Sequence, residues 1–132
     1  MTQEEILEGN KLIAEFLGWR EKESAGEVLY MLDEHICMSY SQLEDFTFHE
    51  DFNELLLVLD KIEDNWEEIS ITGSREMTGG DHKEYECEIV TTGYQYITQA
   101  RGFSSSRIEA VYQACLQYIR KYNTGTLTQP TK

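Results

Sequence analysis

The feature that most constrains the fold is a change of hydrophobic period along the second half of the chain. Apolar and polar side chains first alternate in three short segments, a pattern typical of half-buried antiparallel strands, at 66–72, 84–90 and 94–100. Glycine-containing turns separate these segments. From Ser106 the period becomes helical, and Ser106 with Glu109 forms a capping box in front of a continuous apolar face. The pattern predicts a three-stranded meander followed by a helix over 107–122.

Two further segments have helical spacing, 3–17 and 50–64. The first opens with Thr2 as a cap and acids in its first turn, and the second carries a leucine-rich stripe. We therefore expect an α+β protein with the order α, irregular, α, β, β, β, α. It should form one domain over 1–122, followed by a flexible tail, 123–132.

The packing follows from the alternation. The helices at 50–64 and 107–122 should cover the apolar sheet face, which is formed by Ile69, Ile71, Tyr85, Cys87 and Ile89. Helix 3–17 should lie beside them or on the opposite sheet face. The segment 19–48 has the weakest pattern: it begins with a polar loop, and residues 28–32 and 36–40 form a possible hairpin. We expect it to be irregular or weakly β.

The charge distribution is uneven. The net charge is −14, and the first 68 residues hold 19 acidic and 4 basic residues (4 − 19 = −15), against 6 acidic and 7 basic in the remainder (7 − 6 = +1). Such a chain repels phosphates and anionic lipids and attracts basic partners, so we expect neither nucleic-acid nor membrane binding. Solubility alone is an equally good explanation of the acidity.

Two groups of acids are candidates for partner binding. Residues 44–68 should present a continuous negative patch opposed only by Lys61. The outward row of the predicted sheet should crowd like charges that a basic partner would relieve. The candidate partner-binding residues are Glu44, Asp45, Glu50, Asp51, Glu54, Glu68, Glu84, Glu86 and Glu88.

Catalytic and metal motifs do not stand out. The three cysteines, Cys37, Cys87 and Cys115, lack ligand spacing and are typical of buried thiols in a reducing compartment. The spacing of His49, Asp51 and Glu54 hints at a metal site but is more typical of an acidic first helical turn. We expect no enzyme activity, no metal and no cofactor. The acidic N-terminus and the absence of a long apolar run predict a cytoplasmic protein.

Three stretches, residues 10–19, 48–63 and 106–123, resemble a family of uncharacterised phage and prophage proteins with the phage ABA sandwich domain. The resemblance implies a phage origin, action in the host cytoplasm and a layered α/β fold, and it brings no catalytic residues. A weaker resemblance, to the double-stranded RNA-binding domain, rests on strands followed by a loop (102–106) and a final helix. Only Arg101 and Arg107 stand where that domain uses lysines, so RNA binding is not favoured.

These observations lead to a hypothesis of function. The protein would be a phage accessory protein that binds a basic host protein stoichiometrically, and one form of this is a nucleic-acid mimic that inhibits a defence nuclease. One alternative is sequestration of a small nucleotide signal. The only residues suited to it are three arginines for phosphate and three tyrosines for stacking, Arg101, Arg107, Arg120, Tyr94, Tyr96 and Tyr112. Another alternative is an interaction domain with no role in defence.

Overall fold

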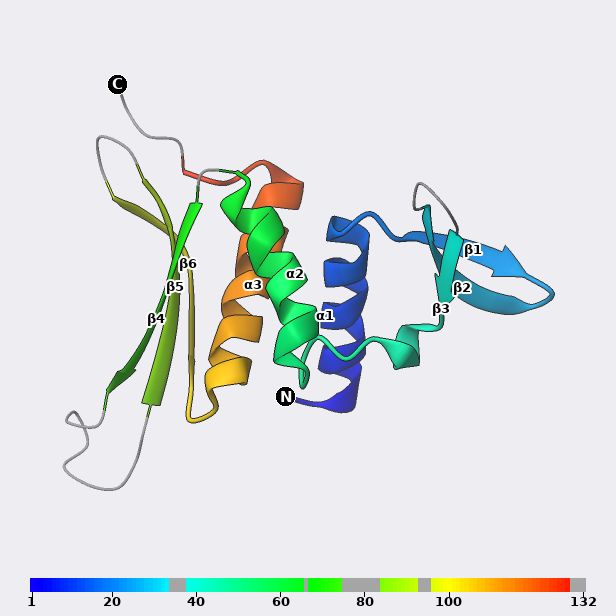
Figure 1. The fold of residues 1–132 in the computed structure, drawn as a ribbon, viewed down its shortest axis with the longest axis horizontal. Helices are drawn as coiled ribbons and strands as arrows, with labels where there is room; N and C mark the ends of the chain where they lie inside the picture. Colours follow the sequence, from blue (N-terminus) through cyan, green and yellow to red (C-terminus); the bar gives the residue numbers. More distant parts are fainter. Residues whose placement is uncertain (34–37, 66, 75–83, 93–95, 129–132) are drawn as a thin grey trace.

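The computed structural model describes residues 1–33, 38–65, 67–74, 84–92 and 96–128. It contains three long helices and two antiparallel three-stranded sheets (Figure 1). In chain order the elements are α1 (Gln3–Phe16), β1 (Arg20–Ser24), β2 (Glu27–Asp33), β3 (Met38–Ser41), the 3-10 turn η1 (Leu43–Asp45), α2 (Phe52–Glu63), β4 (Glu67–Ser74), β5 (Glu84–Thr91), β6 (Ile97–Ser104) and α3 (Arg107–Thr124). The expected α+β class is confirmed.

The meander β4-β5-β6 is the predicted sheet, and α3 packs directly on it (Figure 1). Of the five residues expected on its apolar face, Cys87 and Ile89 are fully buried, and Ile69 and Tyr85 are partly buried against the core. Ile71 is 37% exposed, so its predicted burial is wrong. It lies on the edge strand β4, where only one neighbouring strand can flank a side chain.

The third strand differs most from its predicted bounds. It runs over Ile97–Ser104 and so includes Gly102 and Phe103, which were expected in a loop. Gly102 looks like a strand breaker in the sequence, but α3 crosses the sheet at this point. A Cβ here would lie 1.9 Å from the carbonyl oxygen of Ala110, so only glycine allows the helix to pack this close.

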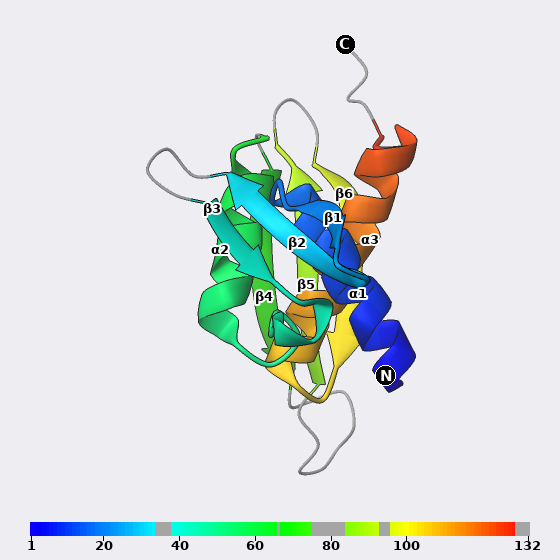
Figure 2. The ribbon, with the colours of Figure 1, turned by 90° about the vertical axis from the view of Figure 1, so that its right-hand side faces the viewer.

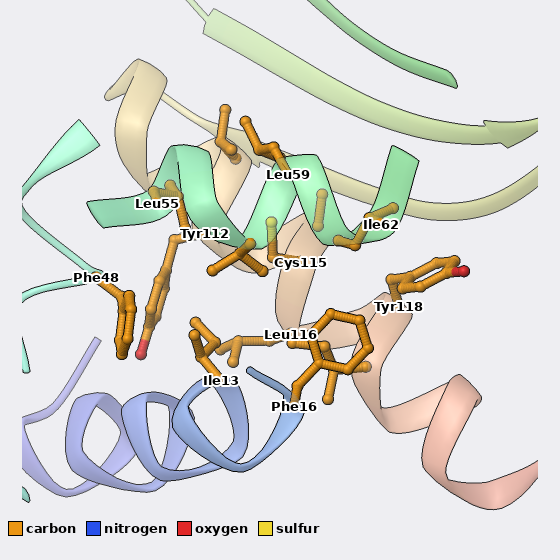
Figure 3. Close-up of a cluster of buried hydrophobic side chains, with 14 of the residues drawn as sticks. Ile13, Phe16, Phe48, Leu55, Leu59, Ile62, Tyr112, Cys115, Leu116 and Tyr118 are labelled. Carbon is orange, nitrogen blue, oxygen red and sulfur yellow. The ribbon is translucent and has the colours of Figure 1, made fainter. Parts of the chain in front are cut away.

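The helices lie between the two sheets. α2 and α3 lie on the β4-β5-β6 side, and α1 lies between them and the small sheet (Figures 1 and 2). Of the two positions predicted for α1, the one beside the other helices holds, because α1 packs against α3 in the shared core; it does so on the side of the helices that is away from the large sheet (Figure 1). Side chains of all three helices meet in one core, including Ile13 and Phe16, Leu55 and Ile62, and Cys115 and Leu116 (Figure 3).

A buried polar network joins α1, α3 and the segment between the small sheet and α2. The side-chain amide of Asn10 donates to the carbonyl oxygen of Phe46 and to Nδ1 of His49, each at 3.1 Å. Its oxygen accepts from the Tyr112 hydroxyl at 2.9 Å. Asn10 is 1% exposed and still has both its donors and its acceptor satisfied.

Residues 19–48 are more ordered than expected, because β1, β2 and β3 form a second antiparallel meander. The polar loop predicted over 20–26 is strand β1 followed by a two-residue turn. Ala25 and Gly26 have φ of 52° and 80°, the positive values that a type I′ hairpin turn requires. The predicted strand 28–32 lies within β2, whereas the predicted 36–40 strand lies partly outside the described residues.

The C-terminal end also differs from the prediction. The last helix continues to Thr124 and ends at Gly125 in the left-handed conformation. Beyond it, Leu127 packs against the core, and Gln99 holds Thr128 by two hydrogen bonds, accepting from its N–H at 2.9 Å and donating to its carbonyl at 2.6 Å. Residues 123–128 of the expected tail are therefore attached to the domain, and 129–132 lie outside the described residues.

The free edge of β6 is covered by one row of α3 side chains. Gln113 accepts from the backbone N–H of Phe103 at 3.3 Å, and Gln117 accepts from that of Arg101 at 2.7 Å. Lys121, one turn further on, donates to the carbonyl oxygen of Gln99 at 2.6 Å. Because these side chains occupy the backbone groups of the edge, β6 is protected from pairing with another chain.

Candidate binding site: an acidic cleft beside the small sheet

A hollow with a mostly apolar lining lies between the small sheet and α2. It has a volume of about 530 Å³. Its lining is apolar except for two hydroxyls and two carboxylates, and consists of Leu17, Trp19, Leu32, Ser41, Asp45, Phe46, Thr47, Phe48, Glu54 and Leu57. We call this hollow the acidic cleft.

An aromatic cluster fixes the back of the cleft. Phe46 stacks on Phe48 with ring centroids 5.4 Å apart, and Trp19 and Tyr30 contact Phe46 edge-on at 5.1 and 5.7 Å. Since Phe46 and Phe48 are buried and Trp19 is half-buried, the cluster anchors the small sheet to the helices. The cleft is therefore formed by packed rings.

The two carboxylates of the cleft come from different elements. Asp45 ends η1, where it accepts a hydrogen bond from the backbone N–H of Gln42 at 3.2 Å. Glu54 lies in the first turn of α2, where the helix dipole favours a negative charge. Within the described residues, no Lys or Arg lies at ion-pair distance from either carboxylate.

The other candidate acids of this region lie on the same stretch of chain. Glu44 precedes Asp45 and lines a second hollow of about 620 Å³ with Glu21 and Glu27. Burial, and then the negative charge of Glu21, Glu15 and Glu44, raises the pKa of Tyr30 above its usual 10.0. Glu50 lies 3.7 Å from His49, whereas Asp51 caps α2 by accepting from Asn53 N–H at 2.9 Å.

The acids of the predicted patch over 44–68 are spread over η1, α2 and β4, and its continuity stays a prediction. Glu54 and Glu63 lie nine residues apart on one helix, about 14 Å at 1.5 Å per residue, which exceeds the screening length of about 8 Å at physiological salt. Lys61 faces α1, where it donates to the carbonyl oxygen of Phe16 and lies 4.9 Å from the Phe16 ring centroid. Residues 44–54 therefore lie toward one end of the predicted patch and Glu63 toward the other, with Asp60 between them on α2.

The glutamates of the large sheet belong to another part of the molecule, because β4-β5-β6 lies on the far side of the helices from the small sheet (Figure 1). Arg101 lies opposite Glu88 in the register and is 3.6 Å from Glu86 and 3.5 Å from Glu88. Thr98 also donates a hydrogen bond to Glu88. Glu68 is in register with Val90, and Glu84 begins the same strand as Glu86. Arg101 therefore compensates Glu86 and Glu88, whereas no described Lys or Arg lies at ion-pair distance from Glu68 or Glu84.

The residues considered for a nucleotide do not converge on one cavity. Arg101 pairs with glutamates, and Arg107 lies 5.1 Å from the Tyr85 ring centroid. Arg120 lines a hollow near the N-terminus, Tyr112 is buried, and Tyr96 is 81% exposed. Tyr94 lies outside the described residues. Neither the acidic cleft, the second hollow nor the hollow beside Arg120 brings two of these arginines together.

The residues considered for metal binding or catalysis have structural roles in the fold. His49 accepts from Asn10, Asp51 caps a helix, and no group of three or more metal-ligating side chains occurs in the described part of the chain. Burial raises the pKa of Cys87 to about 12 and that of Cys115 well above its usual 9.0, so both thiols are unreactive. Cys37 and His82 lie outside the described residues.

Sequence reasoning found the acids of the cleft but not its apolar wall. Leu57 and its neighbour Leu56 are 53% and 42% exposed, although both belong to the leucine run 55–57. The available signal was the run itself, because a helix that buries one face needs no leucine at three successive positions.

Comparisons of the chain with family models, with curated proteins and with solved structures found no match. The resemblance to phage proteins therefore stays a prediction. Of the helices in the described ranges, none has both the length and the apolar content needed to cross a membrane.

Proposed function

We propose that this protein acts by stoichiometric binding to a basic protein partner, which it engages through the acidic surface around the cleft. The observation that carries the proposal is the pairing of Asp45 and Glu54 with an apolar cleft, without a described cation to neutralise them. Uncompensated carboxylates of this kind steer a basic partner into contact, and apolar lining supplies affinity once water is excluded.

The more specific form of the proposal is a phage accessory protein in the host cytoplasm that occupies the nucleic-acid groove of a host defence nuclease. The sequence resemblance provides the phage setting, and the acidity provides the mechanism. This mimicry would use residues 44–54 and their neighbours, because β5 belongs to the other sheet, on the far side of the helices from the small sheet (Figures 1 and 2). An interaction domain without a role in defence would use the same surface, so the identity of the partner decides between them.

The test is affinity capture with two matched variants. One variant neutralises the cleft side, with Glu44→Gln, Asp45→Asn and Glu54→Gln. The control neutralises the same number of charges on the large sheet, with Glu84→Gln, Glu86→Gln and Glu88→Gln. Capture should be performed at about 0.1 M and about 1 M salt, where charges are screened beyond about 10 Å and 3 Å respectively.

We expect a basic protein at low salt that is reduced at high salt, lost from the cleft-side variant and retained by the control. Equal capture by both variants, or loss only from the control, would contradict the proposal. A copurifying nucleotide found by mass spectrometry would favour the sequestration alternative. Inhibition of a captured nuclease, measured with and without the cleft-side variant, would test the defence role.

A further inference from the structure

The acidic cleft has the size and the lining of a site for one large side chain. Its volume of about 530 Å³ falls within the range of small-ligand pockets. Six of its ten lining residues are aliphatic or aromatic, and Leu57, which is 53% exposed, leaves apolar surface in contact with water. An apolar guest would gain free energy by covering this surface.

The carboxylates restrict which guest can enter. A purely apolar ligand would take Asp45 and Glu54 out of water without compensation, which is costly. An anionic ligand would be repelled by the same side chains. A guest with an apolar body and a positive charge beside it avoids both penalties. Lys and Arg next to a large apolar residue in a peptide provide this combination.

The second hollow extends the negative field beyond η1. It is lined by Glu21, Glu27 and Glu44 with Val28 and Tyr30, and Lys11 lies 3.8 Å from Glu21. Glu44 and Asp45 are consecutive residues of η1 that line the second hollow and the cleft respectively. A peptide that crosses η1 would therefore meet carboxylates on both sides of its apolar residue.

We propose that the acidic cleft binds a segment of the partner in which a large apolar side chain is flanked by lysine or arginine. This inference rests on the proposed function and specifies what the partner presents. The apolar side chain would insert between Trp19, Phe46 and Leu57, and the flanking cations would face Asp45 and Glu54.

Two peptides of equal charge test the insertion directly. They are acetylated and amidated Lys-Lys-Trp-Lys-Lys and Lys-Lys-Ser-Lys-Lys, labelled for fluorescence anisotropy. Burying a large apolar side chain is worth enough to expect about tenfold tighter binding of the Trp peptide. This ratio should persist at about 1 M salt, although both affinities fall there because the charges are screened.

Two neighbouring leucines provide the matched variants. Leu57→Lys places a cation on the cleft wall, whereas Leu56→Lys makes the same change on an exposed position of α2 that does not line the cleft. Both variants alter the net charge equally, and circular dichroism checks that both fold. We expect Leu57→Lys to abolish the preference for Trp over Ser and Leu56→Lys to keep it.

The outcomes separate this inference from the proposed function. Equal binding of the two peptides, or an equal loss in both variants, would overturn insertion into the cleft and leave binding by the acidic surface intact. Binding of neither peptide would also overturn the cleft proposal, while the capture experiment decides the proposed function independently.

Discussion

Two buried tyrosines of α3, Tyr112 and Tyr118, should respond in opposite ways to substitution by phenylalanine. The single hydroxyl proton of Tyr112 is shared between Asn10 Oδ1 at 2.9 Å and the carbonyl oxygen of Ile6 at 3.1 Å. Tyr112→Phe leaves the Asn10 oxygen, which is almost completely buried, without its donor. An unsatisfied buried acceptor costs about 1–3 kcal/mol, so we expect a loss of unfolding free energy in that range.

Tyr118 is fully buried but differs in its surroundings. Its hydroxyl has no hydrogen-bond partner among the described residues, although the Asn65 side chain lies nearby. Burial is the main reason that the pKa of Tyr118 rises to about 12. Tyr118→Phe removes a desolvated hydroxyl that makes no hydrogen bond of standard geometry among the described residues and has at most a weak interaction with the Asn65 side chain. We therefore expect the unfolding free energy to stay unchanged or to rise by up to about 1 kcal/mol.

Urea unfolding followed by circular dichroism measures both variants, and an unchanged dependence on urea would show that the comparison is of stability alone. The test is whether the two substitutions change the free energy of unfolding in different directions. A loss of more than about 1 kcal/mol for Tyr118→Phe would mean that its hydroxyl is bonded in solution, with Asn65 the nearest candidate. A neutral Tyr112→Phe would refute the contribution of the Asn10 network.

Three further predictions concern the large sheet. Gly102→Ala should lower the free energy of unfolding, measured in urea, by about 3 kcal/mol or more, because the added Cβ would lie 1.9 Å from a backbone oxygen of α3. A variant within about 1 kcal/mol of the native protein would contradict the close packing. Gln117→Ala removes the acceptor of the Arg101 N–H and should cost about 0.5–1.5 kcal/mol, and self-association measured by sedimentation tests whether the opened edge pairs. Burial raises the pKa of Glu67 above 4.5, so its folded form binds protons more readily and its contribution to stability falls as the pH rises through that raised pKa. Glu67→Gln should therefore raise the free energy of unfolding, relative to the native protein, more at pH 7 than at pH 4. An equal change at both pH values would contradict this.

The helices and the large sheet could be predicted from sequence because each has one apolar and one polar face. The small sheet could not be predicted in the same way. Its first strand, Arg20–Ser24, is an edge strand whose sequence, Arg-Glu-Lys-Glu-Ser, has no apolar alternation. What holds it is the backbone pairing with β2 and the turn at Ala25-Gly26, and neither leaves a hydrophobic pattern.

Glycines give a similar lesson, because a glycine can end an element or allow close packing within it. Gly9 stands inside α1, where helix propensity disfavours it. A Cβ there would lie 2.3 Å from the Tyr112 hydroxyl, so the residue provides room for the polar network between α1 and α3. The sequence shows the glycine, but only the packing of a helix more than 100 residues away explains it.

The candidate site was predictable in charge but not in shape. The sequence places 19 of the 25 acids in the first 68 residues, and a count along the chain cannot tell which of them share a surface. The fold puts Glu54 and Glu63 at opposite ends of a helix and turns the β5 row away from both. It also brings Arg101 to that row from β6, whereas residues 44–54 keep their charge beside an apolar cleft. The acids at 44–54 therefore combine unpaired carboxylates with a place for an apolar anchor, and charge neutralisation there should affect binding most.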